Sequence, residues 1–242
     1  MSERKKVLYE YLSALTIAMI AALFIRIFII QAFRIPTGSM KDTLLVGDFI
    51  LVSKFEYGVK FPDTLPGTNL SLPAFRFPRF RHPQRGDVIV FKYPKDKSVD
   101  YIKRCVGLPG DTIIIRNNRV TINGEPEGVR HFVSDTFDIQ DHQQIATFMI
   151  ETPETSYTIR KQVNGRSRMD SYGPVVVPPD HYFMMGDNRD NSYDSRYWGF
   201  LPRDCIIGRA LVIYFSINQS AYDAPQHLIT AVRWRRLFKR IR

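Results

Sequence analysis

Cysteine is scarce in this sequence, with Cys105 and Cys205 the only two among 242 residues. Two cysteines cannot build a disulfide framework, and the chain has no Cys-x-x-Cys motif of the kind that binds metals or performs redox chemistry. Pairing in an oxidising compartment would require Cα atoms within disulfide reach, which a sequence does not give. We expect two small, separately buried apolar residues, and whether they pair stays open.

Histidine, the usual base beside a catalytic serine, is also sparse. All five histidines lie in predicted loops or at strand starts, and none has the setting of a catalytic triad: His82, His131, His142, His181 and His227. Two of them, with nearby aspartates, imitate a metal site, but the spacing matches no ligand pattern: His131, His142, Asp135, Asp138 and Asp141. We therefore expect no metal site, and nothing implies an organic cofactor.

Acidic residues are missing from the C-terminal end and few at the N-terminal end, where the excess positive charge lies. The net charge is +10, and residues 233–242 carry +6 of it without an acid. Arg4, Lys5 and Lys6 against Glu3 give +2, and subtracting +6 and +2 from +10 leaves only +2 for the body. Basic charge at the ends of an anchored chain favours lipid headgroups over nucleic acid as the partner.

Charge is nearly absent from the long apolar segment near the N-terminus. From Tyr11 to Phe33 the only charged residue is Arg26. At about 1.5 Å per residue, a helix of this length covers the ~30 Å hydrocarbon core of a bilayer. The segment predicts a transmembrane helix within residues 8–33, with residues 1–7 in the cytoplasm because their basic cluster follows the positive-inside rule.

Two alternatives to a retained anchor are a cleaved signal peptide and a buried core helix. A signal peptide has an apolar region of about 7–15 residues followed by small residues at its cut site. Here the apolar run is longer and ends with the bulky sequence Gln31-Ala32-Phe33-Arg34. The length and the exit both favour a retained anchor.

Helical periodicity is absent between the anchor and the tail. Short apolar runs bounded by Gly, Pro and Asn predict strands at 49–52, 88–91, 101–106, 111–115, 119–122, 175–177, 181–185 and 205–215. Residues 125–171 are polar and irregular, with strand-like 144–151 and 156–162, and predict a small accessory β insertion. We therefore expect a mainly β domain over residues 34–231, with antiparallel sheets forming a partly closed or sandwich-like core after one transmembrane helix.

Two further stretches have a lipid-facing interpretation. Residues 70–81 alternate aromatics, arginines and prolines, which is typical either of a loop packed on the core or of a patch dipping into the lipid interface. In the tail, residues 232–242, apolar residues fall at i, i+3, i+4 and i+7 (Trp234, Leu237, Phe238 and Ile241). This spacing predicts a basic amphipathic helix on anionic lipid, with a frayed end as the alternative.

A serine lies on a turn directly after the anchor, within Arg34–Asp48. Pro36 fixes its own φ, and Gly38 should allow backbone angles that a side chain forbids, so that Ser39 is held out on a bend. Serine needs a base beside it to act as a nucleophile. In the predicted strand 101–106, Lys103 shares a face with the largely apolar Tyr101 and Cys105, which should lower its pKa toward neutrality. The alternative is an ordinary surface lysine on an edge strand.

Three stretches together carry a resemblance that no single one of them carries: residues 34–48, 100–111 and 186–199. In this order they resemble the motifs of the bacterial type I signal (leader) peptidases, which are membrane-bound Ser/Lys proteases. The resemblance runs from about Phe33 to about Ala210 and favours the base over the surface lysine.

The resemblance implies that Ser39 is the nucleophile and Lys103 the general base. It assigns the oxyanion hole to the backbone N–H of Ser39 and the hydroxyl of Thr37, where many family members have serine. Ser192 matches a serine that orients the lysine, and Asp194 and Arg196 match a supporting ion pair. A polar loop with solvated charges is the alternative for 186–199.

The resemblance also implies the walls of the substrate pockets, which are shallow and apolar and would accept alanine-sized side chains: Phe33, Ile35, Met40, Leu44, Ile50, Tyr101 and Ile102. The implied activity is removal of signal peptides from exported preproteins after a small-x-small sequence. The implied location is the bacterial inner membrane, with the catalytic domain on the periplasmic or outer side, near the translocation machinery.

Two rival functions stay open at this point. One is a specialised Ser/Lys peptidase that processes pilin or conjugation proteins. The other is a non-catalytic anchored β module that binds lipid or partner chains.

Overall fold

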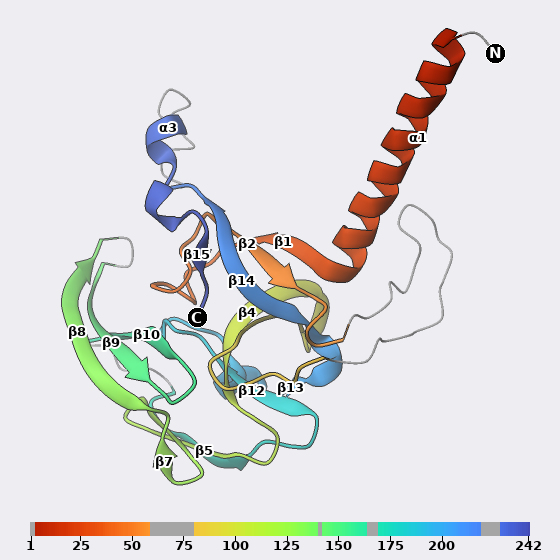
Figure 1. The fold of residues 1–242 in the computed structure, drawn as a ribbon. Helices are drawn as coiled ribbons and strands as arrows, with labels where there is room; N and C mark the ends of the chain where they lie inside the picture. Colours follow the sequence, from red (N-terminus) through yellow and green to blue (C-terminus); the bar gives the residue numbers. More distant parts are fainter. Residues whose placement is uncertain (1–2, 59–79, 140–141, 164–168, 219–227) are drawn as a thin grey trace.

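The structure is a computed structural model that describes residues 3–58, 80–139, 142–163, 169–218 and 228–242 (Figure 1). It is built mainly from antiparallel strands, as expected. Of the stretch 70–81, residues 70–79 lie outside the described residues, so both interpretations of it stay predictions.

The largest sheet runs in the order β1-β2-β14-β3-β4-β12-β13, with β15 added on β14. Its strands are β1 (Ile30–Arg34), β2 (Asp48–Ser53), β3 (Val88–Tyr93), β4 (Asp96–Gly107), β12 (His181–Met185), β13 (Leu201–Pro202), β14 (Ile206–Ser216) and β15 (Lys239–Arg240). The long β14 pairs with β2 along one part and with β3 along another, and its register shifts at several points. Gly208 permits this because a Cβ there would lie 2.1 Å from the Ser53 carbonyl oxygen.

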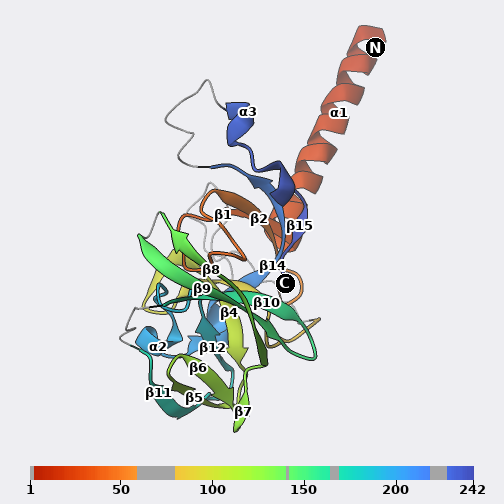
Figure 2. The same ribbon diagram turned by 90° about the vertical axis from the view of Figure 1, so that its left-hand side faces the viewer.

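Two smaller sheets complete the fold. A four-stranded sheet has the order β11-β5-β6-β7 and comprises β5 (Thr112–Arg116), β6 (Arg119–Ile122), β7 (Glu125–Pro126) and β11 (Tyr172–Val176). The turn between β5 and β6 places Asn117 and Asn118 at φ 50° and 60°, the left-handed conformation that two-residue hairpins need. The strands β5 and β6 therefore form a hairpin, and Figures 1 and 2 show the four-stranded sheet at the end of the molecule away from α1.

Within the stretch predicted as an accessory insertion, the chain forms a three-stranded sheet in the order β10-β9-β8, which we call the accessory sheet. Its strands are β8 (Val129–Asp138), β9 (Gln143–Glu151) and β10 (Ser156–Gln162). The sequence indicated β9 and β10 but not β8, which is one of the two edge strands. Most of β8 is exposed, so no alternation of buried and exposed residues marks it.

The core is divided into several packed clusters. One lies between β1, β2, β3, β4 and β14, and a second surrounds Phe91, Trp198 and Met184. Cys105 and Cys205 are both buried in this second cluster and both are free thiols, as we expected. A third cluster joins β5 and β6 to β12.

The N-terminal helix is shorter than predicted. Helix α1 spans Glu3–Phe24, a π-helical turn follows at Ile25–Ile29, and the chain then enters β1. Residues 30–34 pair with β2 in unbroken register, from Ile30 opposite Ser53 to Arg34 opposite Phe49. The prediction of one helix reaching Phe33 is therefore wrong, because a short apolar run suits a strand as well as a helix when a partner strand is available.

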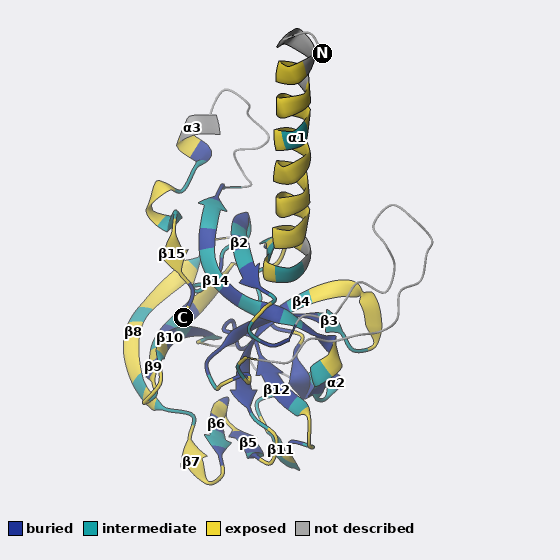
Figure 3. Cartoon of the chain, turned by 45° about the vertical axis from the view of Figure 1, so that its right-hand side comes forward, coloured by how far each residue is buried: buried dark blue, intermediate teal, exposed yellow. Residues whose placement is uncertain are grey.

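Helix α1 stands away from the body, and its side chains are largely exposed (Figure 3). None of the helices in the described residues combines the length and apolar character needed to cross a membrane.

The C-terminal tail is not the amphipathic helix that its spacing predicted. Helix α3 (Leu228–Ala231) precedes the tail, which contains a 3₁₀ turn at Trp234–Arg236 and the short strand β15. Ile241 is buried in the first core cluster, whereas Trp234 and Phe238 are 63% and 77% exposed. Pairing of β15 with β14 and burial of Ile241 together override the helical spacing, so this prediction is wrong.

Candidate active site

Ser39 lies on an irregular turn between β1 and β2, which we call the Ser39 turn (residues 35–47). Its ends are closed by two backbone hydrogen bonds, from Ile35 N–H to the Asp48 carbonyl at 2.8 Å and from Gly47 N–H to the Ile35 carbonyl at 3.0 Å. Inside the turn, the fully buried side chains of Met40 and Leu44 hold it against the first core cluster. The turn is therefore a fixed part of the molecule and presents Ser39 at a defined place.

Positive φ in this turn occurs at Asp42 and Gly47, not at Gly38. Asp42 has φ 79°, in the left-handed region, whereas Gly38 does not adopt positive φ. The expectation for Gly38 is therefore wrong in its reason. A Cβ on Gly38 would lie 2.9 Å from Lys41 Cε, so the glycine instead makes room for the Lys41 side chain.

Lys103 occupies the centre of the main sheet, on β4 opposite Ile89 of β3. Its side chain is almost fully buried and runs past the Tyr101 ring, whose centroid is 5.3 Å from Nζ. Nζ donates to Ser39 Oγ at 2.7 Å and to the Ile102 carbonyl at 3.1 Å. The structure thus brings together the two residues that the sequence placed 64 positions apart.

Burial lowers the pKa of the Lys103 ammonium to about 8. The cause is loss of hydration, which disfavours the charged form. Asp194 and Asp187 act in the opposite direction and limit the fall. A lysine with this pKa is partly neutral near pH 7 and can accept a proton.

The two predicted oxyanion donors lie next to Ser39 along the chain. The Thr37 side chain is exposed. Within the described residues, neither the Thr37 hydroxyl nor the Ser39 backbone N–H is used in a hydrogen bond. Both groups are therefore free to donate to a substrate oxygen.

The loop 186–199 braces the Ser39 turn from the other side. Asn188 donates its backbone N–H to the Ser39 carbonyl at 3.0 Å and its Nδ2 to the Gly38 carbonyl at 3.1 Å. Gly186 allows this approach, because a Cβ there would lie 2.6 Å from the Ser39 carbonyl oxygen. Sequence reasoning missed Asn188, whose only signal was its place in the third motif.

The ion pair predicted between Asp194 and Arg196 is present and fully buried. Arg196 donates from Nε and Nη2 to the two carboxylate oxygens of Asp194, both at 2.8 Å. Asp194 also accepts from the Gly186 N–H at 3.1 Å and caps the short helix α2 (Ser195–Trp198). The pair therefore holds both ends of the loop.

Ser192 is buried in the same loop, and its Oγ makes no hydrogen bond to any described residue. A Cβ on Gly186 would meet this oxygen at 2.2 Å, so Ser192 packs against the Gly186 backbone. No hydrogen bond joins it to Lys103, and its role in orienting the lysine stays a prediction.

A second buried ion pair was missed from sequence. Arg104 donates from Nε and Nη2 to the carboxylate of Asp187 at 2.7 and 2.6 Å. Thr43 of the Ser39 turn donates to the same carboxylate at 2.5 Å. A buried arginine beside Lys103 needs a carboxylate partner, but the sequence alone could not choose Asp187 from the other acids.

Most of the predicted substrate-contacting residues gather in one place. The first core cluster contains Ile35, Met40, Leu44, Ile50 and Ile102, with Phe33 packed against it. Tyr101 instead packs against the neighbouring cluster. The pocket assignment stays a prediction, since the five clustered residues are 8% exposed or less.

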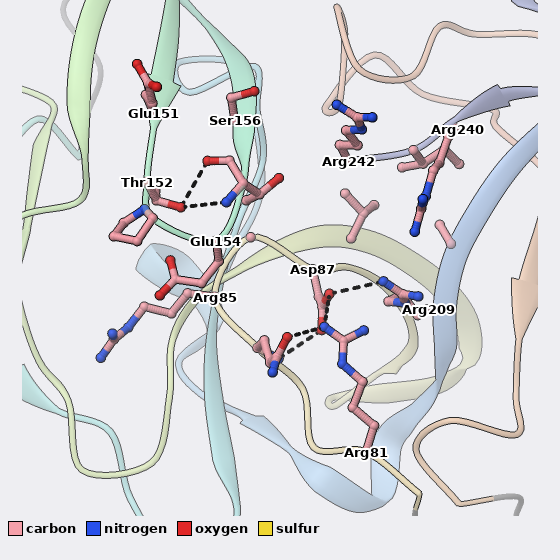
Figure 4. Close-up of a pocket in the computed structure, with 17 residues that line it drawn as sticks. Arg81, Arg85, Asp87, Glu151, Thr152, Glu154, Ser156, Arg209, Arg240 and Arg242 are labelled. Carbon is pink, nitrogen blue, oxygen red and sulfur yellow. Dashed lines mark hydrogen bonds and ion pairs between the residues drawn. The ribbon is translucent and has the colours of Figure 1, made fainter.

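A polar cleft of about 470 Å³ lies outside this site, between the loop at 81–88, the β9–β10 turn and the C-terminus (Figure 4). Asp87 lies between Arg81 and Arg209, at 3.2 and 3.7 Å. Arg240 and Arg242 lie across the cleft from Glu151. Neither Ser39 nor Lys103 lines it.

Among the described residues, no three His, Cys, Asp or Glu side chains converge as metal ligands. His131 instead lies 3.2 Å from Glu151 across the strand pair. At Ser39 the structure places an alcohol beside a buried amine, a pairing that suits acyl transfer.

Comparison with known proteins agrees with this class of chemistry. The model of the family described as "Signal peptidase, peptidase S26" matches residues 8–215. A signal peptidase I of Pseudomonas fluorescens is 38% identical over 224 residues, covering 88% of this chain and 74% of the relative. One from Aquifex aeolicus (strain VF5) is 37% identical over 249 residues, covering 90% and 89%.

A crystal structure of a signal peptidase I from Enterococcus faecalis V583 shares 29% identity and covers 53% of this chain and 97% of that chain, with a TM-score of 0.32. This score is too low to support the fold, which is defined here by the strand order.

The protein is thus a serine endopeptidase. The chain belongs to the signal peptidase family, peptidase S26.

Proposed function

We propose that this protein cleaves N-terminal signal peptides from exported preproteins, after a small-x-small sequence, with Ser39 as nucleophile and Lys103 as general base. The observation that carries the proposal is the 2.7 Å contact between Lys103 Nζ and Ser39 Oγ, made by an amine whose side chain is almost fully buried. Family membership supports the same reaction.

In the acylation step, the neutral Lys103 amine accepts the Ser39 hydroxyl proton while Oγ attacks the scissile carbonyl carbon. Negative charge develops on the carbonyl oxygen and is stabilised by the Ser39 N–H and the Thr37 hydroxyl. The Lys103 ammonium then gives its proton to the leaving amine as the C–N bond breaks. The products are an acyl ester on Ser39 and the free N-terminus of the mature protein.

In the deacylation step, a water molecule takes the place of the leaving amine. Lys103 accepts a proton from this water, and the resulting hydroxide attacks the ester carbonyl. The proton then passes to Ser39 Oγ as the ester bond breaks, which regenerates the neutral amine. One lysine thus serves both half-reactions, and no metal enters either of them.

The apolar residues around the Ser39 turn account for the preference for small side chains. Met40, Leu44 and Ile102 are buried in the core cluster against which the Ser39 turn packs. With these residues as its walls, the proposed substrate pocket would be shallow and apolar. A large side chain would overlap with them, whereas an alanine-sized one would fit. This supports cleavage after small residues.

We also place the enzyme at the bacterial inner membrane, with its catalytic domain on the outer side near the translocation machinery. Support comes from α1, whose exposed side chains between Tyr11 and Ile25 include no charge. Exposed apolar side chains in such a row are suited to contact with lipid. The basic N-terminus would then remain in the cytoplasm.

The test is cleavage of a preprotein by the purified protein in detergent, with wild type beside Ser39→Ala and Lys103→Ala. Both variants should lose cleavage by at least about 1000-fold, since one removes the attacking hydroxyl and the other the amine that accepts its proton. Correct folding of each variant is checked by circular dichroism. Retained cleavage by the folded Lys103→Ala variant would exclude lysine as the base, and retained cleavage by Ser39→Ala would exclude the nucleophile.

A further inference from the structure

The accessory sheet β8–β10 contacts the Ser39 turn through two charged side chains. Asp138 is the last residue of β8, and its Oδ2 accepts from Lys41 Nζ at 3.2 Å and from Arg160 Nη1 at 2.8 Å. Arg160, on β10, also places its Nε 3.4 Å from Asp42 Oδ2. Lys41 and Asp42 are the second and third residues after Ser39, so the accessory sheet reaches the turn beside the serine.

This cluster is balanced in charge and shielded from water. It contains two cations and two carboxylates. The side chains of Lys41, Asp138 and Arg160 are 9%, 12% and 9% exposed, and that of Asp42 is 28% exposed. Charges in such a place interact more strongly than at the surface, and removal of one partner leaves another unpaired. The contacts therefore fix geometry to a degree that a surface ion pair would not.

Asp42 itself has a backbone conformation that its surroundings help to impose. Its φ of 79° lies in the left-handed region, which is uncommon for a residue with a side chain. Such a conformation persists when the surroundings impose it. Arg160 beside the Asp42 carboxylate is one of those surroundings.

Arg160 is joined to the Ser39 turn by a second route through its main chain. Its N–H donates to the Asp187 carbonyl at 2.9 Å, and its own carbonyl accepts from Arg189 N–H at 3.0 Å. Between these two residues lies Asn188, which donates to the carbonyls of Ser39 and Gly38. Arg160 therefore supports Ser39 both through the Asp42 side of the turn and through the loop that braces it.

We propose that Asp138 and Arg160 of the accessory sheet are positioning residues for Ser39, which act through Lys41, Asp42 and Asn188. The inference rests on the proposed role of Ser39 as the nucleophile. In this proposal the accessory sheet contributes to catalysis indirectly, because it fixes the distance between Ser39 Oγ and Lys103 Nζ without touching the substrate.

The experiment measures kcat and KM separately on a signal-peptide substrate for Asp138→Asn, with Asp135→Asn as the matched control. Asp135 is on the same strand but exposed, and it accepts a hydrogen bond from Gln144 at 3.3 Å. Because a small misplacement of a reacting group costs rate, kcat should fall about 10- to 100-fold for Asp138→Asn. KM should stay within about twofold, and the control should match wild type.

Two further variants protect the test against simple misfolding. Lys41→Met keeps the packing beside Gly38 but removes the charge, and it should lower kcat at least about fivefold on its own. Combined with Asp138→Asn it should add little, because the loss of the Asp138 charge already weakens the Lys41 contact. Multiplication of the two losses in the double variant, or a kcat for folded Asp138→Asn within about twofold of wild type, would overturn the inference.

The outcome also separates this inference from the proposed function. If Ser39→Ala is inactive while Asp138→Asn and Lys41→Met are fully active, only the positioning role fails. If Ser39→Ala retains cleavage, the nucleophile assignment fails and the positioning role fails with it.

Discussion

Ser39 and Lys103 meet at 2.7 Å but are held in place by different parts of the fold. Lys103 lies on β4, between β3 and β12, and the hydrogen-bond ladders of the sheet fix its backbone. Ser39 lies outside any regular element, and side chains and loops from elsewhere in the chain hold its turn. The base is therefore set by its immediate surroundings, whereas the nucleophile depends on distant residues.

This difference separates the kinds of substitution that harm each residue. A change near Lys103 should act on its pKa, since burial is what lowers it. A change near the Ser39 turn should act on distance and orientation, and so on kcat. Asp194 is the residue where the two effects meet, because it holds the loop 186–199 and also favours the charged form of Lys103.

Asp194→Asn should have the largest effect on stability. It leaves the buried Arg196 guanidinium without its carboxylate, and breaking a buried pair costs about 3–5 kcal/mol in the free energy of unfolding. Denaturant unfolding measures the loss. Asp180→Asn is the control, because Asp180 is largely exposed and lies 3.7 Å from Arg203, and its loss should stay below about 1 kcal/mol. Equal losses for the two variants would contradict the supporting role of Asp194.

The second largest effect is expected in the wild-type enzyme, whose rate of cleavage should depend strongly on pH. The base must be neutral, so kcat/KM should rise with pH up to the Lys103 pKa of about 8 and level off above it. The neutral fraction grows about 100-fold between pH 6 and pH 9. Initial rates at low substrate concentration, corrected for stability at each pH, measure the profile. A flat profile over this range, with chemistry rate-limiting, would falsify the assignment of Lys103 as the base.

The sequence predicted the surroundings of Lys103 better than those of Ser39. Lys103 could be predicted because it shares a strand face with the largely apolar Tyr101 and Cys105, and because the resemblance favoured a base over a surface lysine. The structure confirms its burial. Ser39 could be located on its turn, but the groups that hold it could not, because Asn188, Asp187 and Asp138 are brought there by strand pairing between distant segments. Charged pairs of this kind leave no periodic pattern.

The fold shows the same limit at both ends of the chain. The strands of the body were predicted from short apolar runs, and β2, β3 and β12 lie where these runs are. The prediction extended the helix wrongly through 30–34, because the apolar character of these residues does not reveal that they pair with β2. The tail was assigned helical spacing although Ile241 packs into the core and β15 pairs with β14.

Asn188→Ala tests the support that the loop 186–199 gives to the Ser39 turn. It should reduce kcat about 5- to 20-fold with little change in Tm. The variant loses the Nδ2 bond to the Gly38 carbonyl but keeps the backbone bond to Ser39. Asn191→Ala in the same loop is the control, since Asn191 is exposed. Its activity should match wild type. An Asn188→Ala variant with an unchanged kcat would show that the turn holds its shape without this contact.

The smallest effect on kcat is expected at Arg236, on the C-terminal side of the Ser39 turn. Arg236 forms a bidentate pair with the buried Asp48 at 3.0 and 2.6 Å. It also donates to the Thr43 carbonyl at 3.0 Å. Arg236→Ala should lower kcat only about two- to fivefold and cost about 1–2 kcal/mol of stability. The reason is that Asp48 keeps other partners, the Ser216 hydroxyl at 2.6 Å and the Leu45 N–H at 2.8 Å.

The neighbouring Arg235 supplies the matched control for this variant, because it carries the same charge but is exposed. Arg235→Ala should leave both kcat and Tm unchanged. If Arg236→Ala instead reduced kcat as much as Asp138→Asn, the C-terminal segment would share the positioning of Ser39 equally with the accessory sheet. Measuring kcat for Arg236→Ala and Asp138→Asn in one assay therefore decides whether the accessory sheet alone, or the accessory sheet together with the C-terminal segment, positions Ser39.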